Sequence, residues 1–305
     1  MTKVGTYISG DLPFEDRLRV LKNTGFDFGA LGLGLFSMEG DELEQAVRLC
    51  EKHDFPIDNI HLTGAKTTAL WDSDPLGDEV CDRYCREIAR ASAAGIRVGV
   101  AHITWGHSVP APVGEIGLSR MERIAECAAK HDFILALENS VYLDHLYATM
   151  AHLKDYPSVG FTFDSGHRNA FAHDYDLLGD FGDRLAVTHI ADNDAVHDLH
   201  LMPMDGTVNW EQVAAELAKT EVGRDRILAE PSLGGFKKMK GFSAEQIRRH
   251  IAHMPIAAEG ELLVIEDEQF SAYSPLTYEQ KMERLYIKMK RLAEMVEAAS
   301  QKPTK

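Results

Sequence analysis

Histidine and carboxylate side chains recur at or just after the ends of short apolar runs along this chain. In chain order the residues at these positions are His61, His102, Glu138, Asp164, His189 and Glu230. An unpaired charge in or beside an apolar run is costly, so these side chains need a compensating partner. Because imidazole nitrogen and carboxylate oxygen are ligands of Zn²⁺ and Mn²⁺ in proteins, the pattern predicts a divalent-metal site.

Four of these residues form the core of the prediction. Glu138, Asp164, His189 and Glu230 end four consecutive runs, so they can converge on one ion. The alternative is a network of buried ion pairs or hydrogen bonds without a metal. The sequence places no Lys or Arg at these run ends to neutralise three carboxylates, which favours the metal.

A second set of residues follows the later runs. His167 belongs to the stretch DSGH, and Asp198 and His200 form the stretch DLH. Residues two apart in an extended loop face the same side, which favours Asp198 and His200 as further ligands. The alternative roles for these three are loop structure or substrate binding. For His61 and His102 the alternatives are a hydrogen-bonded core histidine or a substrate contact.

The elements that must position these residues alternate along the chain. Short runs that are apolar on both faces are typical of strands in a covered parallel sheet. They fall at residues 4–9, 28–35, 57–63, 98–104, 134–139, 159–164, 186–192 and 226–231. Stretches with apolar residues at helical spacing lie between them, clearest at 41–53, 78–94, 118–131 and 210–219. Eight strands alternating with helices predict an α/β fold, a (β/α)₈ TIM barrel, whose active site lies at the carboxyl ends of the strands.

The C-terminal part departs from this alternation. We treat residues 1–305 as a single TIM-barrel domain with an insertion at 234–275 after the eighth strand. The barrel then closes with a long helix over about 277–299, where apolar residues recur every three or four positions. We expect the insertion to be either a lid over the site or a contact in a homo-oligomer. Lys237 lies within its stretch FKKMKG and is a candidate for binding substrate, although a solvated lysine face is the alternative.

Composition excludes several classes of protein. The chain has 305 residues and a formal net charge of -16, which disfavours binding to nucleic acid or anionic membranes. No apolar run is long enough to span a membrane, and the N-terminus lacks the apolar core of a signal peptide. The four cysteines form no CxxC, so we expect reduced thiols and a cytoplasmic protein. Cys81 and Cys85 are four residues apart and share one face of a helix.

Several stretches together resemble the xylose-isomerase-like barrel superfamily, which includes sugar-phosphate isomerases and epimerases and the endonuclease IV family. The matching stretches are IHLTG, VAHITW, ALENS, GFTFDSGH, VTHIADND, DLHLMPMDGTVNW and ILAEP, spread over about residues 57–231. The stretch DLHLMPMDGTVNW resembles the motif D-x-H-x-x-P-G-x-G-x-x-D-W of that superfamily. Met204 stands where the superfamily usually has glycine.

The resemblance implies two different metal sites. In the isomerase and epimerase branch, one divalent ion is held at positions that match Glu138, Asp164, His189 and Glu230, and the two glutamates act as acid and base. In the endonuclease branch, nine ligands hold three zinc ions. Those positions match His61, His102, Glu138, Asp164, His167, His189, Asp198, His200 and Glu230, all of suitable type.

We therefore expect an isomerase or epimerase that depends on Mn²⁺ or Zn²⁺, with Co²⁺ or Mg²⁺ as other candidates, and acts on a small hydroxy-carbonyl compound. The substrate would be a sugar, sugar phosphate or cyclitol derivative. Its hydroxyls would contact His61, His102, His167 and Lys237. The alternative is a multi-zinc phosphoester hydrolase with up to three ions, and a third reading is a binding module with a relic site. No arginine follows His189 until Arg224, so we expect substrate recognition to differ from that of epimerases with an arginine there.

Overall fold

The computed structural model describes residues 1–36, 40–232, 243–259, 263–266, 269–273 and 275–301. Strands β1 to β8 form one sheet in the order β7-β6-β5-β4-β3-β2-β1-β8. The first strand pairs in parallel with the last, Lys3 opposite Arg226 and Thr6 opposite Ala229. A further bridge joins Ile190, just after β7, to Ala229 of β8. This topology, with helices between the strands, is that of a (β/α)₈ TIM barrel, as predicted.

All eight predicted strands are present, most of them shorter than predicted. They are β1 (Lys3–Tyr7), β2 (Phe28–Gly32), β3 (Ile57–His61), β4 (Val98–Ala101), β5 (Ile134–Glu138), β6 (Val159–Asp164), β7 (Leu185–His189) and β8 (Arg226–Ala229). The fourth strand ends one residue before His102 and the eighth ends one residue before Glu230. Strand ladders end where the backbone turns toward the rim loops, so these two side chains stand just beyond their strands.

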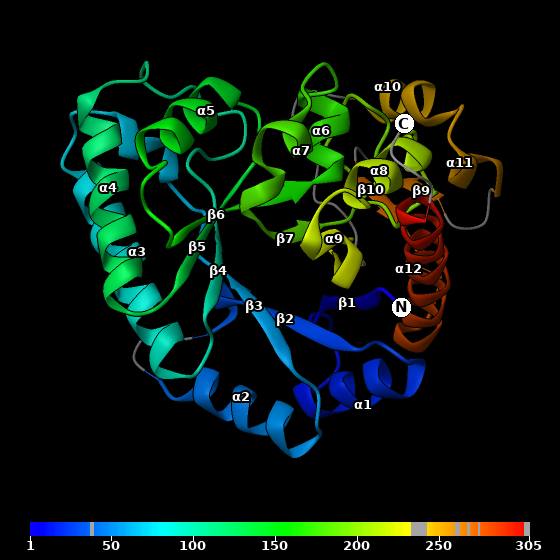
Figure 1. Ribbon diagram of the computed structural model, residues 1–305. Helices are drawn as coiled ribbons and strands as arrows, with labels where there is room; N and C mark the ends of the chain where they lie inside the picture. Colours follow the sequence, from blue (N-terminus) through cyan, green and yellow to red (C-terminus); the bar gives the residue numbers. More distant parts are fainter. Residues whose placement is uncertain (37–39, 233–242, 260–262, 267–268, 274, 302–305) are drawn as a thin grey trace. The chain divides into compact units, whose positions relative to one another are not determined.

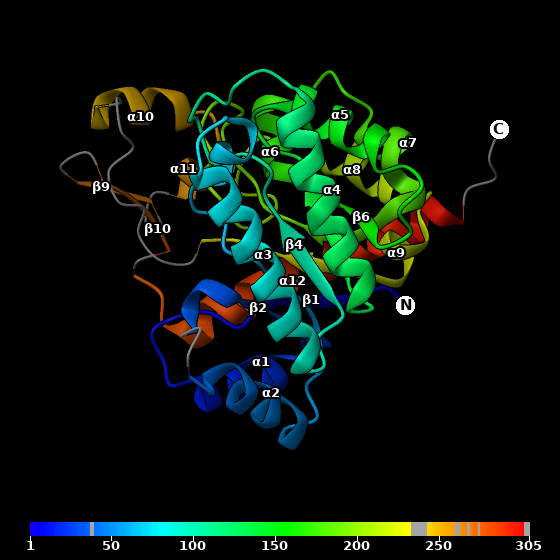
Figure 2. The same ribbon diagram turned by 90° about the vertical axis from the view of Figure 1, so that its left-hand side faces the viewer.

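By its internal contacts the chain divides into two compact units. The second unit consists of Gly29–Phe163 and Asp176–Val187. Its helices are α2 (Glu42–Lys52), α3 (Leu76–Ala93), α4 (Glu115–Lys130), α5 (Leu143–His152) and α7 (Leu177–Phe181). Helices α3 and α4 pack side by side (Figures 1 and 2).

Buried side chains hold α3 and α4 in place. The predicted apolar stripe of α3, Val80, Tyr84, Ile88 and Ala91, is buried. Arg120 of α4 is also buried, and its guanidinium donates to Asp78 of α3 and to the carbonyl oxygens of Ala69 and Leu70. Because the guanidinium has several donors in a fixed geometry, one arginine can fasten the start of α3 and the turn before it to α4.

The first unit consists of Met1–Phe28, Asp164–Tyr175 and Thr188–Lys305. Its barrel helices are α1 (Phe14–Thr24), α6 (Ser165–Phe171), α8 (Trp210–Leu217), α9 (Glu221–Asp225) and α12 (Tyr278–Ser300). The long helix α12 packs against α1 and α8 (Figure 1). It begins with a capping box, in which the Gln280 amide donates to the Thr277 hydroxyl and the Thr277 amide donates to the Gln280 side chain.

The predicted insertion contributes two short helices and a hairpin to the first unit. These are α10 (Ala244–Ile251), α11 (Pro255–Glu259), and the antiparallel strands β9 (Leu263–Glu266) and β10 (Gln269–Ala272). Both helices contact β9 (Figure 2). Lys237 and the rest of 236–241 lie outside the described residues. Whether the insertion acts as a lid or as a subunit contact stays a prediction.

None of the helices in the described ranges combines the length and the apolar character that a membrane span requires.

Candidate metal centre

One cluster of metal-ligand side chains lies within the second unit. The Nε2 atom of His102 is 2.7 Å from Oε2 of Glu138, and Nε2 of His61 is 3.5 Å from the same oxygen. The two imidazole rings meet edge to face with centroids 4.9 Å apart. Each residue offers one ligand atom, and these atoms all lie within 4.8 Å of one another. His61, His102 and Glu138, each predicted as a candidate ligand, therefore lie together in the structure.

Strand ends and a neighbouring helix position this cluster. Glu138 ends β5 and is only 1% exposed. The Nδ1 atom of His61 is 2.8 Å from the carbonyl oxygen of Leu62, which leaves Nε2 to face Glu138. The Tyr84 hydroxyl of α3 donates to the carbonyl oxygen of His102 at 2.7 Å. The first contact orients the His61 ring, and the second holds the backbone of His102.

Glu87 of α3 also supports the cluster and was missed by the sequence analysis. Its Oε2 atom accepts a hydrogen bond from the backbone amide of Thr63, two residues after His61. Burial raises the pKa of Glu87 above its usual value, although the Thr63 hydrogen bonds act in the opposite direction. Its position in the sequence carried a signal, because it is an acidic residue within the apolar stripe of a predicted helix.

A second cluster lies within the first unit. Oδ2 of Asp198 is 3.2 Å from Nε2 of His167 and 3.2 Å from Nε2 of His200. The rings of the two histidines are nearly perpendicular, with centroids 5.9 Å apart. Ligand atoms of all three residues lie within 4.8 Å of one another. This is the second predicted set, brought together on one side of a single carboxylate.

Charge is coupled strongly within this second cluster. Burial alone would raise the pKa of Asp198, but the imidazoles of His200 and His167 hold it well below its usual value. Burial alone would lower the pKa of His200, but the Asp198 carboxylate, with Glu230 and Asp164 nearby, raises it to about 10. The carboxylates thus attract positive charge at this position, which is the electrostatic requirement of a cation site.

The backbone around the second cluster is specialised. Asp164 ends β6 and caps α6, since its Oδ1 accepts the backbone amide of His167 at 2.6 Å. Nδ1 of His200 is 3.0 Å from the carbonyl oxygen of Glu230. His200 itself has φ 44°, in the left-handed region that non-glycine residues rarely occupy. Such conformations persist where the surrounding structure holds them, and they concentrate at functional sites.

His189 and Glu230 form a third feature of the first unit. Nδ1 of His189, which is fully buried at the end of β7, is 2.9 Å from Oε2 of Glu230. On the other side of the ring, Nε2 of His189 is 2.9 Å from the Tyr7 hydroxyl. Tyr7 is the last residue of β1, so it lies at the carboxyl end of a strand, as the other candidate residues do. Its phenolic hydroxyl is neither an imidazole nor a carboxylate, so the metal-ligand pattern in the sequence did not include it.

Asp192, shortly after β7, holds together the loop that carries Asp198 and His200. The Asp192 carboxylate accepts hydrogen bonds from the amides of Asn193, Gly206 and Val208 and from the indole of Trp210. Burial raises the pKa of Asp192 to about 6, against the effect of these donors. The segment that carries Asp198 and His200 is therefore closed into a loop around one buried carboxylate.

Met204 in this motif has φ 70°, which is the left-handed region. Glycine adopts that conformation without steric cost. A left-handed backbone at this position is consistent with the glycine that the motif of the xylose-isomerase-like superfamily usually has there.

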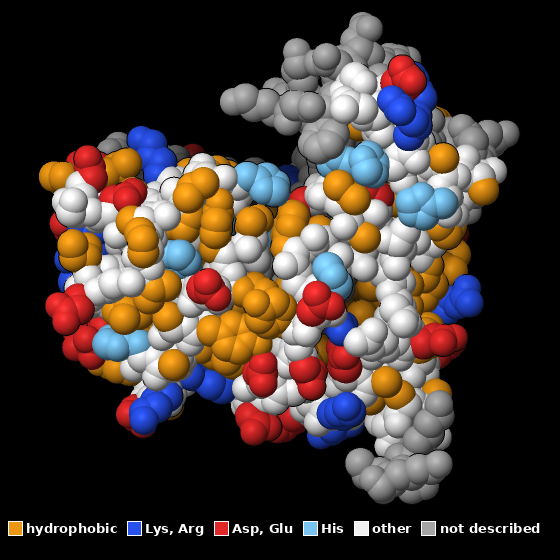
Figure 3. All heavy atoms as spheres, turned by 90° about the horizontal axis from the view of Figure 1, so that it is seen from above, with side chains coloured by type: hydrophobic (Ala, Val, Ile, Leu, Met, Phe, Trp, Pro, Cys, Tyr) orange, Lys and Arg blue, Asp and Glu red, His pale blue; other side chains and the backbone are white. Residues whose placement is uncertain are grey.

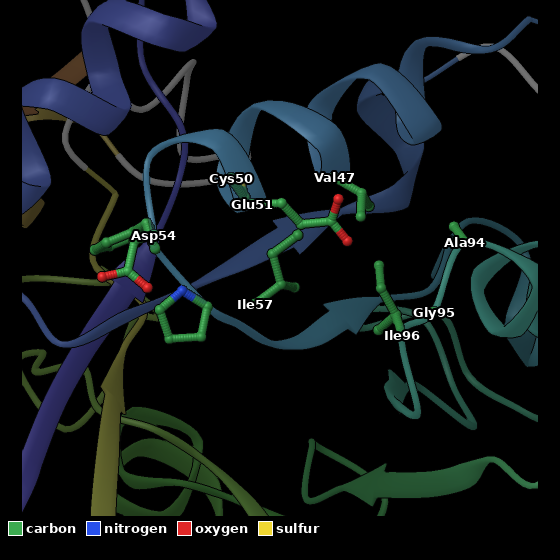
Figure 4. Close-up of a pocket in the computed structure, with 10 residues that line it drawn as sticks. Val47, Cys50, Glu51, Asp54, Ile57, Ala94, Gly95 and Ile96 are labelled. Atoms are coloured by element: carbon green, nitrogen blue, oxygen red, sulfur yellow. The ribbon is translucent and has the colours of Figure 1, made fainter.

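The second unit contains a cavity of about 440 Å³ (Figure 4). Cys50 and Glu51 of α2, Asp54, and Ile57 at the start of β3 line one side of it. It therefore lies at the amino end of β3, whereas His61 lies at the carboxyl end. Since TIM-barrel chemistry occurs at the carboxyl ends, this cavity is not part of the candidate centre.

The fold and the polar strand ends define a TIM barrel with histidine and carboxylate clusters at its strand ends. The chain matches the family described as Xylose isomerase-like TIM barrel over residues 18–252, more than half its length, and it belongs to that family. Among curated proteins, it is 37% identical over 76 residues to the uncharacterized protein y4fM of Sinorhizobium fredii. That match spans about a quarter of either protein, 25% of this chain and 24% of the other.

Several solved structures share the fold. An L-ribulose 3-epimerase aligns with TM-score 0.69 at 13% identity, covering 98% of this chain and 96% of its own. D-psicose 3-epimerase from Clostridium cellulolyticum H10 gives 0.67 at 14%, covering 97% and 99%. The 3-keto-D-glucoside 4-epimerase of E. coli gives 0.60 at 16%, covering 83% and 98%. At these identities the likeness establishes the fold alone.

The donor sets fit a divalent cation. Each three-residue cluster combines two imidazoles with one carboxylate. Each carboxylate lies beside imidazole nitrogen atoms, which can bind a metal ion when they carry no proton. The candidate centre thus consists of groups whose chemistry suits a cation.

Proposed function

We propose that this protein is a divalent-metal-dependent isomerase or epimerase that acts on a small hydroxy-carbonyl substrate. One observation carries the proposal. Two strand-end carboxylates, Glu138 and Glu230, each lie within 2.9 Å of a histidine nitrogen, from His102 and His189 respectively. The sugar epimerases among the structural neighbours support the substrate class, a sugar, sugar phosphate or cyclitol derivative.

In this proposal Glu138, Asp164, His189 and Glu230 hold one ion, Mn²⁺ or Zn²⁺ by their chemistry, with Co²⁺ or Mg²⁺ as other candidates. A bound divalent cation would polarise a carbonyl oxygen of the substrate and make the neighbouring C–H more acidic. One of Glu138 and Glu230 then removes that proton. The other, or a water molecule, returns a proton, and return on the opposite face inverts the stereocentre.

Other residues bind the substrate in this proposal. His61 and His102 contact its hydroxyls from the second unit, and His167 does so from the first. Lys237 is a further candidate, for a phosphate group in particular. Tyr7 holds the ring of His189 through Nε2 and so keeps Nδ1 toward Glu230. We place the activity in the cytoplasm, since Cys50, Cys81, Cys85 and Cys127 are free thiols.

Solvent exchange tests the proposal directly. Metal-reconstituted protein is incubated in D₂O with a panel of ketoses, ketose phosphates and cyclitol ketones, and deuterium at carbon is followed by NMR. We expect exchange beside the carbonyl of at least one compound. Glu138→Gln and Glu230→Gln should abolish it, whereas Glu294→Gln, on the exposed face of α12, should leave it unchanged. Exchange that persists in both site variants would refute the proposed acid–base pair.

A second candidate function rests on a separate observation. The clusters His61–His102–Glu138 and His167–Asp198–His200 each gather three ligand atoms, and the six atoms together are more than the four that one tetrahedral ion takes. This supports a multi-zinc phosphoester hydrolase with up to three ions. Hydrolysis of bis(p-nitrophenyl) phosphate, without exchange on the ketose panel, would favour that candidate.

The substrate of such a hydrolase would be a small phosphoester. The net charge of -16 disfavours a DNA substrate. Among the described side chains on the face seen in Figure 3, Lys and Arg lie scattered between acidic groups and form no basic groove.

A further inference from the structure

A chain of hydrogen bonds leads from a buried carboxylate of α3 to one of the candidate ligands in the second unit. Oε2 of Glu87 accepts the backbone amide of Thr63 at 3.0 Å. Nδ1 of His61 lies 2.8 Å from the carbonyl oxygen of Leu62. This carbonyl and the Thr63 amide belong to one peptide group, which is planar. Glu87 and the His61 ring therefore bind opposite edges of the same rigid plane, and the position of one constrains that of the other.

The contact with Leu62 decides which nitrogen of His61 carries a proton. A carbonyl oxygen only accepts hydrogen bonds, so Nδ1 is the donor. In the neutral ring Nε2 then has the lone pair, and it lies 3.5 Å from Oε2 of Glu138. Histidines that bind metal ions donate their other ring nitrogen to a carboxylate or a backbone carbonyl, which fixes the tautomer and the ring orientation. His61 has this arrangement, with a peptide group between its ring and the carboxylate of Glu87.

Arg83, one turn before Glu87 in α3, completes the attachment of this segment. Its Nη2 donates to the carbonyl oxygen of Thr63 at 2.8 Å, and its Nε lies 3.8 Å from Oε1 of Glu87. One ion pair thus holds both polar groups of the Thr63 backbone. The side chain of Glu87 is almost fully buried, and that of Arg83 is largely buried. Because desolvation offsets much of the attraction in a buried ion pair, stability alone is a poor explanation for this one.

The ring of His200 provides a comparison within the same protein. Its Nδ1 also lies against a backbone carbonyl, that of Glu230, at 3.0 Å. The next residue is Pro231, so the peptide group that contains this carbonyl has no N–H and cannot bind a carboxylate on its other edge. A hydrogen-bond chain through a peptide group is therefore possible at His61 and impossible at His200.

We propose that Glu87 is a positioning residue of the candidate centre. Through the Leu62–Thr63 peptide it keeps the proton of His61 on Nδ1 and Nε2 turned toward Glu138. Hydrogen bonds in a chain polarise one another, so the charge of Glu87 also makes Nε2 a stronger electron donor. The proposal rests on the proposed function only in its last step, the use of Nε2 by a bound cation or by a substrate hydroxyl.

Nuclear magnetic resonance of protein with ¹⁵N-labelled histidine tests the positioning without metal or substrate. Long-range ¹⁵N–¹H spectra at about pH 8, where an ordinary imidazole is neutral, distinguish the two tautomers, and His61→Gln assigns the signal. Wild type should show a single tautomer, protonated on Nδ1. The double variant Arg83→Met/Glu87→Leu leaves neither charge buried without its partner and should remain folded, which circular dichroism checks. We expect it to show a mixture of tautomers, whereas Glu79→Leu, at an exposed position of α3, should match wild type.

Glu87→Gln and zinc affinity complete the test. Glutamine keeps an oxygen for the Thr63 amide but carries no charge, so this variant should retain the single tautomer of His61. Zinc affinity, measured by competition with a chelating dye, should fall by about 10–100-fold in the double variant and by less in Glu87→Gln. An altered His61 tautomer with unchanged zinc affinity would support the positioning and assign Nε2 to a substrate hydroxyl.

Two results would overturn the proposal. One is the same single tautomer of His61 in wild type and in the double variant, whatever happens to zinc binding. The other is a mixture of tautomers in wild type itself. If wild type binds no zinc while the His61 signal responds as expected, the positioning is supported and the proposed metal centre fails.

Discussion

The Nε2 atom of His102 lies 2.7 Å from Oε2 of Glu138, and the two residues follow and end the paired strands β4 and β5. Parallel pairing places the carboxyl ends of neighbouring strands together, so a barrel needs no loop to bring these groups into contact. Glu138 is almost fully buried, and a buried carboxylate needs a cationic partner or a proton. The imidazole can be that partner only when protonated, whereas a divalent ion satisfies both groups without a proton.

Glu138→Gln is the most informative substitution at this contact. It keeps the size of the side chain and the hydrogen-bonding oxygen, so we expect the variant to fold and to melt close to wild type. It removes a charge and the capacity to accept a proton, so turnover should fall by about 10²–10⁴-fold or below detection. Circular dichroism and the deuterium-exchange assay measure the two effects. Full activity with saturating metal would mean that Glu138 is neither base nor ligand.

Tyr7→Phe tests whether Tyr7 positions His189. The hydroxyl lies 2.9 Å from Nε2 of His189, and loss of a group that orients a ligand typically costs about 10–100-fold in metal affinity or activity. We expect a loss of metal affinity in that range, measured by competition with a chelating dye. Tyr175→Phe, at an exposed tyrosine of the same unit, is the matched control. Equal affinities in both variants would show that the Tyr7 contact has no influence on the site.

Tyr273→Phe tests how the segment after β8 is fastened to the loop that follows His200. The buried Tyr273 hydroxyl donates to Oδ2 of Asp205 at 2.6 Å and accepts the backbone amide of Met202 at 2.9 Å. Its removal leaves two buried polar groups without this partner, so the free energy of unfolding should fall by about 1–3 kcal/mol. Urea denaturation measures the loss. A change below about 0.5 kcal/mol would mean that the contact contributes little.

Asp194→Asn tests how the stability of the protein depends on pH. Burial raises the pKa of Asp194, but hydrogen bonds from the His197 ring and from nearby amides outweigh burial and lower the pKa below its usual value. The ionised form therefore stabilises the fold at neutral pH, and this contribution disappears as the pH falls through the lowered pKa. The variant should be less stable than wild type at pH 7, and the gap should close below about pH 4. Denaturation midpoints across that range check it, and a gap that widens at low pH would contradict it.

Met204→Gly should not destabilise the protein, unlike most substitutions. Met204 has φ 70°, and a glycine there relieves the steric cost of the left-handed region, while the more flexible unfolded chain offsets part of the gain. We expect an unchanged or slightly higher melting temperature. Met202→Gly, at a fully buried neighbour in the same loop, is the contrasting control and should lower it clearly. A clear loss of stability in Met204→Gly would mean that the methionine side chain matters more than its backbone conformation.

The sequence predicted the barrel and the candidate residues at its strand ends, because strand ends are readable from apolar runs. His61, His102 and Glu138 lie together in the structure, and so do His167, Asp198 and His200, while their role as metal ligands stays a prediction. Supporting residues were harder to find. Tyr7 and Glu87 act through contacts with residues far away in the sequence, and a strand or helix pattern alone does not reveal those partners.

In the segment after β8, sequence patterns predict a helix but not the contacts between distant residues. The long final helix was readable from apolar spacing, and it is present as α12. The anchoring contact between Tyr273 and Asp205 joins residues 68 apart in the chain, and no local pattern marks it.

The most direct test of the account is the metal content of the protein. Protein purified without chelator or histidine tag is dialysed against metal-free buffer and analysed by plasma mass spectrometry, beside His189→Ala prepared in the same way. The account predicts about one Mn, Zn, Co or Mg ion per wild-type chain and its loss from the variant. About three zinc ions per chain would instead favour the phosphoesterase. No retained metal in wild type, even after reconstitution, would contradict the central claim that these histidines and carboxylates form a metal centre.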